Sequence, residues 1–179
     1  MIKKLLLGLV AIIAAICGIA AFQPDEMNVS RSATISASPD VVFKVVNDFR
    51  QWDAWSPWSK LDPAMKKSWE GPSEGVGAIY RWSGNNEVGE CSMTLIESRP
   101  NEMIGVKLEF IRPFAGLSDV QFTFVPEGAG TKVTWSMQSK NAFMAKVIGL
   151  LMDFEKMCGD SFTEGLASLN KVVTATPKP

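Results

Sequence analysis

The sequence predicts an α+β domain in which a curved antiparallel sheet of about six to seven strands packs on one long C-terminal helix, with a separate apolar helix at the N-terminus. Three observations support this prediction. Segments between residues 29 and 139 alternate apolar and polar side chains, as half-buried strands do. From Ala142 to Val173 the apolar residues recur at three- and four-residue steps, which is typical of a helix. Residues 5–22 carry no charge.

The uncharged N-terminal run predicts a membrane anchor over residues 1–22. It holds about 18 residues, near the minimum of ~17–20 that a spanning helix needs. Lys3 and Lys4 precede the run, and Asp25 and Glu26 follow it. Because positive charge stays on the cytoplasmic side, we expect a single pass through the inner (cytoplasmic) membrane, with a cytoplasmic N-terminus and the domain on the periplasmic or extracellular side. A cleaved signal peptide is the alternative interpretation.

The remaining chain divides into a linker, one domain and a tail. Residues 23–28 are expected to form the linker, residues 29–173 the domain and residues 174–179 a disordered tail. The first strand is expected at residues 29–37. A helix should follow, because Ser38 is a good N-cap and Pro39 suits the first helical position.

Further strands are marked by their alternation and by the turns between them. Gly84-Asn85-Asn86 and the segment 127–130 are strong turn signals. Strands are expected over residues 65–70, 76–83, 88–98, 103–112, 118–126 and 131–139. In the C-terminal helical region, Gly149, Gly159 and Gly165 either bend the helix, let it lie close to the sheet, or mark a break between two helices.

The composition excludes several classes of function. The chain has no histidine, which removes the commonest general base and metal ligand, so we expect no metal site and no cofactor. The net charge of −1 gives no indication of nucleic-acid binding. Only Cys91 and Cys158 could pair within the domain, and we expect them to be free, buried residues.

Three tryptophans fall within the stretch QWDAWSPWSKLDP at residues 51–63. Pro57 pushes Ser56 toward an extended conformation, so the chain turns there. We expect Trp52 and Trp55 to anchor this corner, with their indole N–H groups bound to the backbone or to Asp53. Trp58 is expected to form the entrance wall of a cavity.

Several motifs together resemble those of the START/Bet v 1-like (SRPBCC) superfamily, in its polyketide cyclase/dehydrase-like branch. They are ISASPDVVFKVVND (35–48), WDAWSPW (52–58), Asp62-Pro63, EGP (70–72), GVGAIYRWSG (75–84), FIRP (110–113), GTKVTWSM (130–137) and FTEGLASLNKVV (162–173). The resemblance implies a helix-grip fold, in which the sheet wraps around the C-terminal helix and leaves a hydrophobic tunnel between them.

The parity of the predicted strands indicates which side chains would line this tunnel. The expected ligand-binding residues are Trp58, Trp69, Tyr80, Trp82, Met93, Leu108, Phe110, Phe122, Trp135, Met137, Phe143, Val147, Leu151 and Phe154. Val106 and Phe124 share this face of the sheet. Phe143, Val147, Leu151 and Phe154 would come from the C-terminal helix, as would Phe162. A solid core would have the same composition, so packing is the alternative role for each of them.

The sequence favours a membrane-tethered binding or carrier domain for a hydrophobic small molecule or lipid. One alternative is a cyclase- or dehydratase-like enzyme, which needs a group that moves protons and one that stabilises an enolate. Tyr80 is the candidate catalytic residue, because a phenol on the inner face could donate a hydrogen bond to an oxyanion. The other alternative is a cell-envelope accessory module with a filled core. Partners other than the ligand and the membrane are not indicated.

Overall fold

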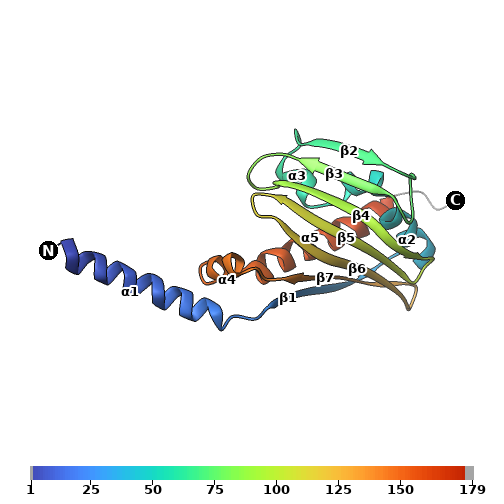
Figure 1. The fold of residues 1–179 in the computed structure, drawn as a ribbon. Coiled ribbons are helices and arrows are strands. Elements are labelled where there is room, and N and C mark those ends of the chain that lie inside the picture. Colours follow the sequence, from blue (N-terminus) through green and yellow to red (C-terminus); the bar gives the residue numbers. More distant parts are fainter. Residues whose placement is uncertain (1, 176–179) are drawn as a thin grey trace.

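The computed structural model describes residues 2–175, which form one long sheet and several helices (Figure 1). The helical segments are α1 (Ile2–Ala21), α2 (Pro39–Asn47), the 3-10 helix η1 (Phe49–Ala54), α3 (Trp58–Leu61), α4 (Phe143–Gly149) and α5 (Phe154–Ala175). The strands are β1 (Glu26–Ile35), β2 (Lys66–Glu70), β3 (Ile79–Ser83), β4 (Glu90–Arg99), β5 (Met103–Arg112), β6 (Gly116–Glu127) and β7 (Gly130–Lys140).

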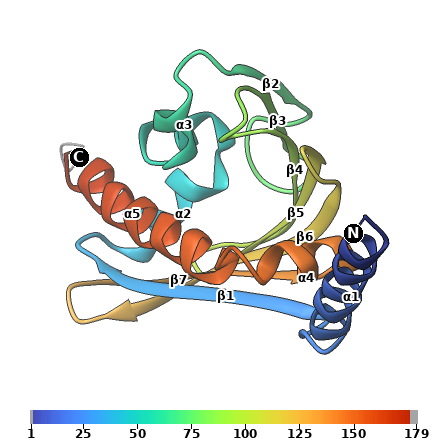
Figure 2. The ribbon, with the colours of Figure 1, turned by 90° about the vertical axis from the view of Figure 1, so that its left-hand side faces the viewer.

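The strands form a seven-stranded antiparallel sheet in the order β1-β7-β6-β5-β4-β3-β2. Strands that follow one another along the chain are neighbours, except that β1 pairs with β7. The sheet curves, and α5 lies across its concave side (Figure 2). This confirms the predicted α+β architecture, and the arrangement is that of the helix-grip fold.

Helix α5 packs on the sheet through one stripe of residues. Phe162, Leu166, Leu169 and Val173 are all buried and lie four, three and four positions apart, as one face of a helix requires. Gly165 allows close approach, because a Cβ at this position would lie 2.7 Å from the ring of Trp135 on β7. The prediction that glycines bring the helix close to the sheet is therefore correct for Gly165.

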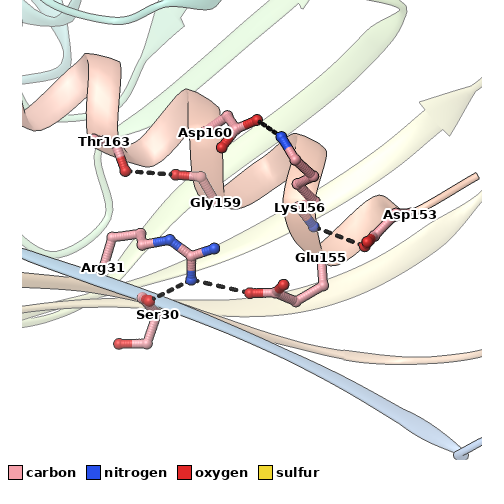
Figure 3. A network of polar contacts seen from close by, with 8 residues as sticks. All are labelled: Ser30, Arg31, Asp153, Glu155, Lys156, Gly159, Asp160 and Thr163. Atoms are coloured by element: carbon pink, nitrogen blue, oxygen red, sulfur yellow. Dashed lines mark hydrogen bonds and ion pairs between the residues drawn. The ribbon is translucent and has the colours of Figure 1, made fainter.

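A polar network fastens the start of α5 to β1 (Figure 3). The Arg31 guanidinium donates to Glu155 Oε1 at 2.9 Å and to the carbonyl of Ser30 at 2.8 Å. It also occupies the space that a side chain at Gly159 would need. Asp153 Oδ1 accepts a hydrogen bond from the backbone N–H of Lys156 and so caps the helix.

The C-terminal helical region consists of two helices, which was one of the three interpretations of its glycines. Helix α4 ends at Gly149, and α5 begins at Phe154 after a short non-helical link. Helix α4 contains no buried residue, whereas α5 contains six. The two helices therefore differ in how firmly packing holds them.

Two boundaries differ from those expected. Strand β1 begins at Glu26, so the segment between α1 and the sheet is Phe22–Asp25 rather than residues 23–28. Helix α5 continues to Ala175, two residues into the predicted tail, because its helical hydrogen bonding extends past the last buried residue, Val173. The rest of that tail, residues 176–179, lies outside the described residues.

The tryptophan segment forms η1 and α3, and two of its three tryptophans are core residues. Trp52 is buried and donates its indole N–H to the carbonyl of Val46 at 2.8 Å, as expected. Trp55 is fully buried, but its indole N–H has no hydrogen-bond partner among residues 2–175, so the expectation of one is wrong for this residue. Trp55 is held by ring packing instead, 4.8 Å from Trp52 and 5.6 Å from Trp135 between centroids.

Candidate ligand-binding cavity

A cavity of about 720 Å³ lies between the concave face of the sheet and the α4–α5 region. Pockets for small molecules usually measure about 300–1,000 Å³ and are mostly apolar. This cavity falls within that range of volumes. It is partly open to solvent.

The floor of the cavity consists of alternate residues from four neighbouring strands. Met93 of β4 pairs with Leu108 of β5, and Val120 of β6 pairs with Met137 of β7. All four side chains line the cavity. Since side chains in a strand alternate between faces, the polar residues between them point to the outer face of the sheet. The strand period thus produces a mostly apolar floor, to which β6 and β7 add the hydrogen-bonded hydroxyls of Ser118 and Ser139.

Aromatic rings form one wall of the cavity. Trp135 of β7 stacks on Phe162 of α5, with ring centroids 4.2 Å apart and planes inclined by 6°. Trp58 of α3 packs edge-on against both rings, at 5.8 and 6.5 Å. Tyr80 and Trp82 of β3 continue the lining, with centroids 5.3 Å apart.

The mouth of the cavity is surrounded by three segments: the β3–β4 turn, the β5–β6 loop and α4. The lining residues from these segments are Asn86, Glu87, Val88, Gly89, Pro113, Phe114, Ala115, Ala142, Met144, Ala145 and Ile148. Arg112 lies at this rim, where its guanidinium donates to the carbonyl of Gly84 at 3.2 Å and lies 3.5 Å from Glu90. Its charge is paired at the rim.

Three titratable groups of the lining, Tyr80, Cys91 and Cys158, have raised pKa values and are neutral. Burial raises the pKa of the Tyr80 phenol well above its usual range, and the negative charge of Asp53 raises it further. Burial also raises the pKa of the Cys91 thiol to about 12. The pKa of Cys158 is raised by burial first and by Glu155 second. Both cysteines are free, as expected, and at neutral pH both are thiols rather than nucleophilic thiolates.

The structure places nine of the fourteen predicted binding residues in the cavity wall. They are Trp58, Tyr80, Trp82, Met93, Leu108, Phe110, Trp135, Met137 and Phe154. Two sheet residues lie elsewhere. Phe122 is fully buried behind the wall, with its ring 4.8 Å from that of Trp135. Trp69, on the edge strand β2, is 39% exposed and stacks on Tyr80.

The other three, Phe143, Val147 and Leu151, lie in or just after α4 and do not line the cavity. Helix α4 is separate from α5, so its inward face is not the one expected for a single continuous helix. Met144 and Ile148 line the cavity instead. Leu151, in the link to α5, is 89% exposed.

Sequence reasoning also missed lining residues in the β5–β6 loop and at the start of β6. Phe114 and Leu117 line the cavity and are largely exposed at its mouth. The available signal was an apolar content that is unusual for a surface loop. Among residues 2–175, no cluster of three or more His, Cys, Asp or Glu side chains could hold a metal ion.

Comparisons with known proteins agree with this geometry. The model of a family described as "Polyketide cyclase / dehydrase and lipid transport" matches residues 26–174. The chain belongs to this family. The match covers every strand and all helices except α1. No curated protein matches the chain.

Solved structures share the fold of this family member at low identity. Protein MLL2253 from Mesorhizobium loti is 15% identical, with a TM-score of 0.62 over 85% of this chain and 100% of the other. Protein CV1439 from Chromobacterium violaceum is 16% identical, with a TM-score of 0.61 over 87% and 100%. The Aha1 dimer from Colwellia psychrerythraea is 15% identical, with a TM-score of 0.60 over 85% and 99%. Such similarities show the fold alone.

Proposed function

We propose that this family member is a membrane-tethered domain that binds or carries a hydrophobic small molecule or a lipid. The observation that supports this best is the cavity itself, which has a mostly apolar floor, an aromatic wall and an opening to solvent. Each methylene group moved from water into such a space contributes about 0.8 kcal/mol. A ligand with an extended apolar part would therefore gain most from this site.

The volume of the cavity favours binding over a filled-core accessory module. A module of that kind would have no cavity of ~300 Å³ or more, the lower end for ligand pockets. The cavity of about 720 Å³ is more than twice as large. The residues around it are thus arranged as a wall rather than as a solid core.

Tyr80 supports a second candidate function, a cyclase- or dehydratase-like activity. Its raised pKa keeps the phenol protonated, so it can donate a hydrogen bond to a carbonyl or an enolate oxygen. A proton-transfer partner would also be needed, and the two thiols in the wall are poor bases at neutral pH because their pKa values are raised. Binding is the function that the lining supports better.

The tether of the proposal is α1. Among the described residues it is the one helix long and apolar enough to cross a membrane, and almost all of it is exposed. A buried core helix is therefore excluded as its role. A signal sequence remains the competing role, and fractionation of cells that express a C-terminally tagged chain distinguishes the two. An uncleaved product in the membrane fraction supports the tether, and a shortened product released from it contradicts the tether.

Photo-cross-linking tests the ligand. The full chain is reconstituted in phosphatidylcholine vesicles that contain a palmitic acid analogue with a diazirine in its acyl chain, and the labelled peptides are identified by mass spectrometry. We expect labelling of β4, β5 and β7 peptides that contain Met93, Leu108 and Met137. Labelling restricted to α1 would contradict binding of an acyl chain in the cavity.

A matched pair of variants makes this test specific. Leu108→Trp fills the cavity floor and should abolish labelling of the β4 and β7 peptides. Val125→Trp adds the same side chain on the outer face of β6, where Val125 is exposed, and should leave labelling unchanged. Equal labelling in both variants would show that the label does not enter the cavity.

A further inference from the structure

Hydrogen bonds and an ion pair join the mouth of the cavity to the link between α1 and β1. The backbone N–H of Asn141, just before α4, donates to the carbonyl of Asp25 at 2.8 Å. The Asn141 side chain donates to the carbonyl of Pro24 at 3.1 Å. Lys146 of α4 forms an ion pair with the Asp25 carboxylate. Helix α1 also contacts α4, and Ala20 near the end of α1 is fully buried. Helix α4 and the end of α1 are therefore neighbours.

Strand register places the other segments of the mouth at the same end of the strands. Strand β1 starts at Glu26, which pairs with Lys140 at the end of β7. Across the sheet, Ser139 pairs with Ser118 near the start of β6, and Glu90 at the start of β4 pairs with Arg112 at the end of β5. The β5–β6 loop and the β3–β4 turn thus lie at the end of the sheet at which β1 begins. In Figure 1 this is the side from which α1 projects.

Exposed apolar side chains gather around the mouth. We call them the mouth patch: Phe114, Leu117, Met144 and Met152 from the lining, with Phe22 in the link after α1 and Leu151 next to Met152 in the chain. Phe114, Leu117, Met144 and Met152 line the same cavity and belong to segments at its mouth. Scattered exposed apolar residues are ordinary, but a group of them around an opening marks an interaction surface.

We propose that the mouth patch contacts the lipid bilayer in which α1 is embedded, so that the cavity opens onto the bilayer and its apolar ligand enters without crossing water. This inference rests on the tether of the proposed function. The link from α1 to the sheet is the four residues Phe22, Gln23, Pro24 and Asp25. Four extended residues span at most about 14 Å, so the start of β1 stays within that distance of the end of α1.

The dimensions of a bilayer make this contact possible. The polar headgroup region adds about 5–7 Å on each side of the hydrocarbon core, less than the link can span. Apolar side chains of interfacial segments bury about 5–10 Å into this region. The mouth patch needs no rearrangement of the fold to reach that depth.

Helix α4 is one part of the mouth that could move when the patch meets lipid. It has no buried residue, and its cavity side carries Met144 and Ile148. The start of α5 is held separately by Arg31, which binds Glu155 and lies against Gly159 (Figure 3). Opening at α4 would therefore leave α5 and the cavity wall in place.

Fluorescence quenching at single positions tests the contact. In a background with Cys17, Cys91 and Cys158 replaced by alanine, one cysteine is introduced as Phe114→Cys, Leu117→Cys or Leu151→Cys and labelled with a nitrobenzoxadiazole dye. Val125→Cys is the matched control, because Val125 is exposed near the opposite end of the strands. The full chain is reconstituted in phosphatidylcholine vesicles at high lipid excess, with or without a phospholipid that carries a spin label on its acyl chain.

We expect the spin-labelled lipid to quench the three mouth positions at least about twofold more than position 125, since depth in the interface governs such quenching. Weak quenching equal to that at position 125 would show that the mouth faces water and would overturn the inference. A blue-shifted emission without quenching would mean that protein, such as a second copy of the chain, covers the patch, and would also overturn it.

The two proposals can fail separately. Protein that does not float with vesicles would contradict the tether, and with it both proposals. Strong quenching at the mouth, with cross-linking of palmitic acid confined to α1, would leave the bilayer contact standing and contradict the ligand. Cross-linking inside the cavity without quenching at the mouth would support the ligand and contradict the bilayer contact.

Discussion

Trp135 of β7 lies parallel to Phe162 of α5, with ring centroids 4.2 Å apart and planes inclined by 6°. This stack joins the sheet to the long helix and at the same time forms part of the cavity wall. Trp58 of α3 packs edge-on against both of these rings. The contact that stabilises the fold is therefore also a boundary of the candidate site.

Truncation of this stack should destabilise the protein strongly. Phe162 is buried, and Phe→Ala in a core costs about 3–5 kcal/mol. We expect Phe162→Ala to lower the free energy of unfolding by that amount in denaturant titrations of the full chain in detergent. Phe143→Ala is the control, because Phe143 is 48% exposed, and it should change the free energy by less than about 0.5 kcal/mol. Similar losses in both variants would contradict the role assigned to the stack.

A methyl group at Gly165 should separate the helix from the sheet. Its Cβ would lie 2.7 Å from the Trp135 ring and 3.3 Å from Pro57, so Gly165→Ala should cost about 1–3 kcal/mol despite the better helix propensity of alanine. Gly149→Ala is the matched control, because nothing lies within 4 Å of its added Cβ. There the propensity gain of up to about 1 kcal/mol should appear unopposed. Thermal unfolding followed by circular dichroism compares the two, and equal shifts would refute the close approach.

The fold was predictable from sequence mainly in those elements that expose one face to solvent. Val120 and Phe122 alternate with polar residues along β6, which gives a clear period of two. The break between α4 and α5 was only one of several interpretations, because Val147, Leu150 and Phe154 keep helical spacing across it. Only the capping interaction of Asp153 marks the new start, and aspartate is also common within helices.

The candidate site was predictable in its floor and not in its mouth. Met93 and Leu108 follow from strand parity, because a sheet covered on one face buries every second residue. Phe114 and Met144 lie in a loop and in a short helix, where no period indicates a direction. Their exposure is set by tertiary placement, so the sequence could not separate them from ordinary core residues.

The single tyrosine of the chain gives a direct reading of the cavity environment. Because burial raises the pKa of Tyr80, the phenol should stay protonated in the folded chain beyond its ordinary pKa of 10.0. Tyrosinate absorbance should therefore be absent at pH 10–11 in the native protein and appear near pH 10 in guanidinium. The protonated form is favoured in the fold, so this contribution to stability is present below pH 10 and is lost as pH rises toward the raised pKa. Normal titration of the native protein would show that the phenol is solvated.

Tyr80→Phe separates a hydrogen-bonding role from a packing role. If the phenol donates to a ligand oxygen, the variant should bind palmitic acid more weakly by about 0.5–1.5 kcal/mol, roughly 2–13-fold. The ring contacts with Trp69 and Trp82 remain, so stability should change little. Competition of unlabelled palmitic acid against the diazirine probe measures the affinity. Unchanged affinity would limit Tyr80 to the packing of the wall.

The ion pair between Lys146 and Asp25 should hold α4 beside the end of α1. The Lys146 side chain is 9% exposed, and its hydrogen bond and charge lower the pKa of Asp25 below the ordinary value of 3.8. Because the pKa of the carboxyl is lowered, the ion pair stabilises the position of α4 beside α1 above pH 3.8. This stabilisation is lost as the pH falls through the lowered pKa. Asp25→Asn should then speed hydrogen exchange of the α4 peptide at neutral pH, relative to a β5 peptide of the same sample. Glu26→Gln, one residue along the chain, is the control and should leave the ratio unchanged.

In the unmodified chain the same ratio should rise only when the pH falls below about 3.8, and the Asp25→Asn variant should lack this rise. A ratio that is insensitive to both the substitution and the pH would show that α4 is held by other contacts.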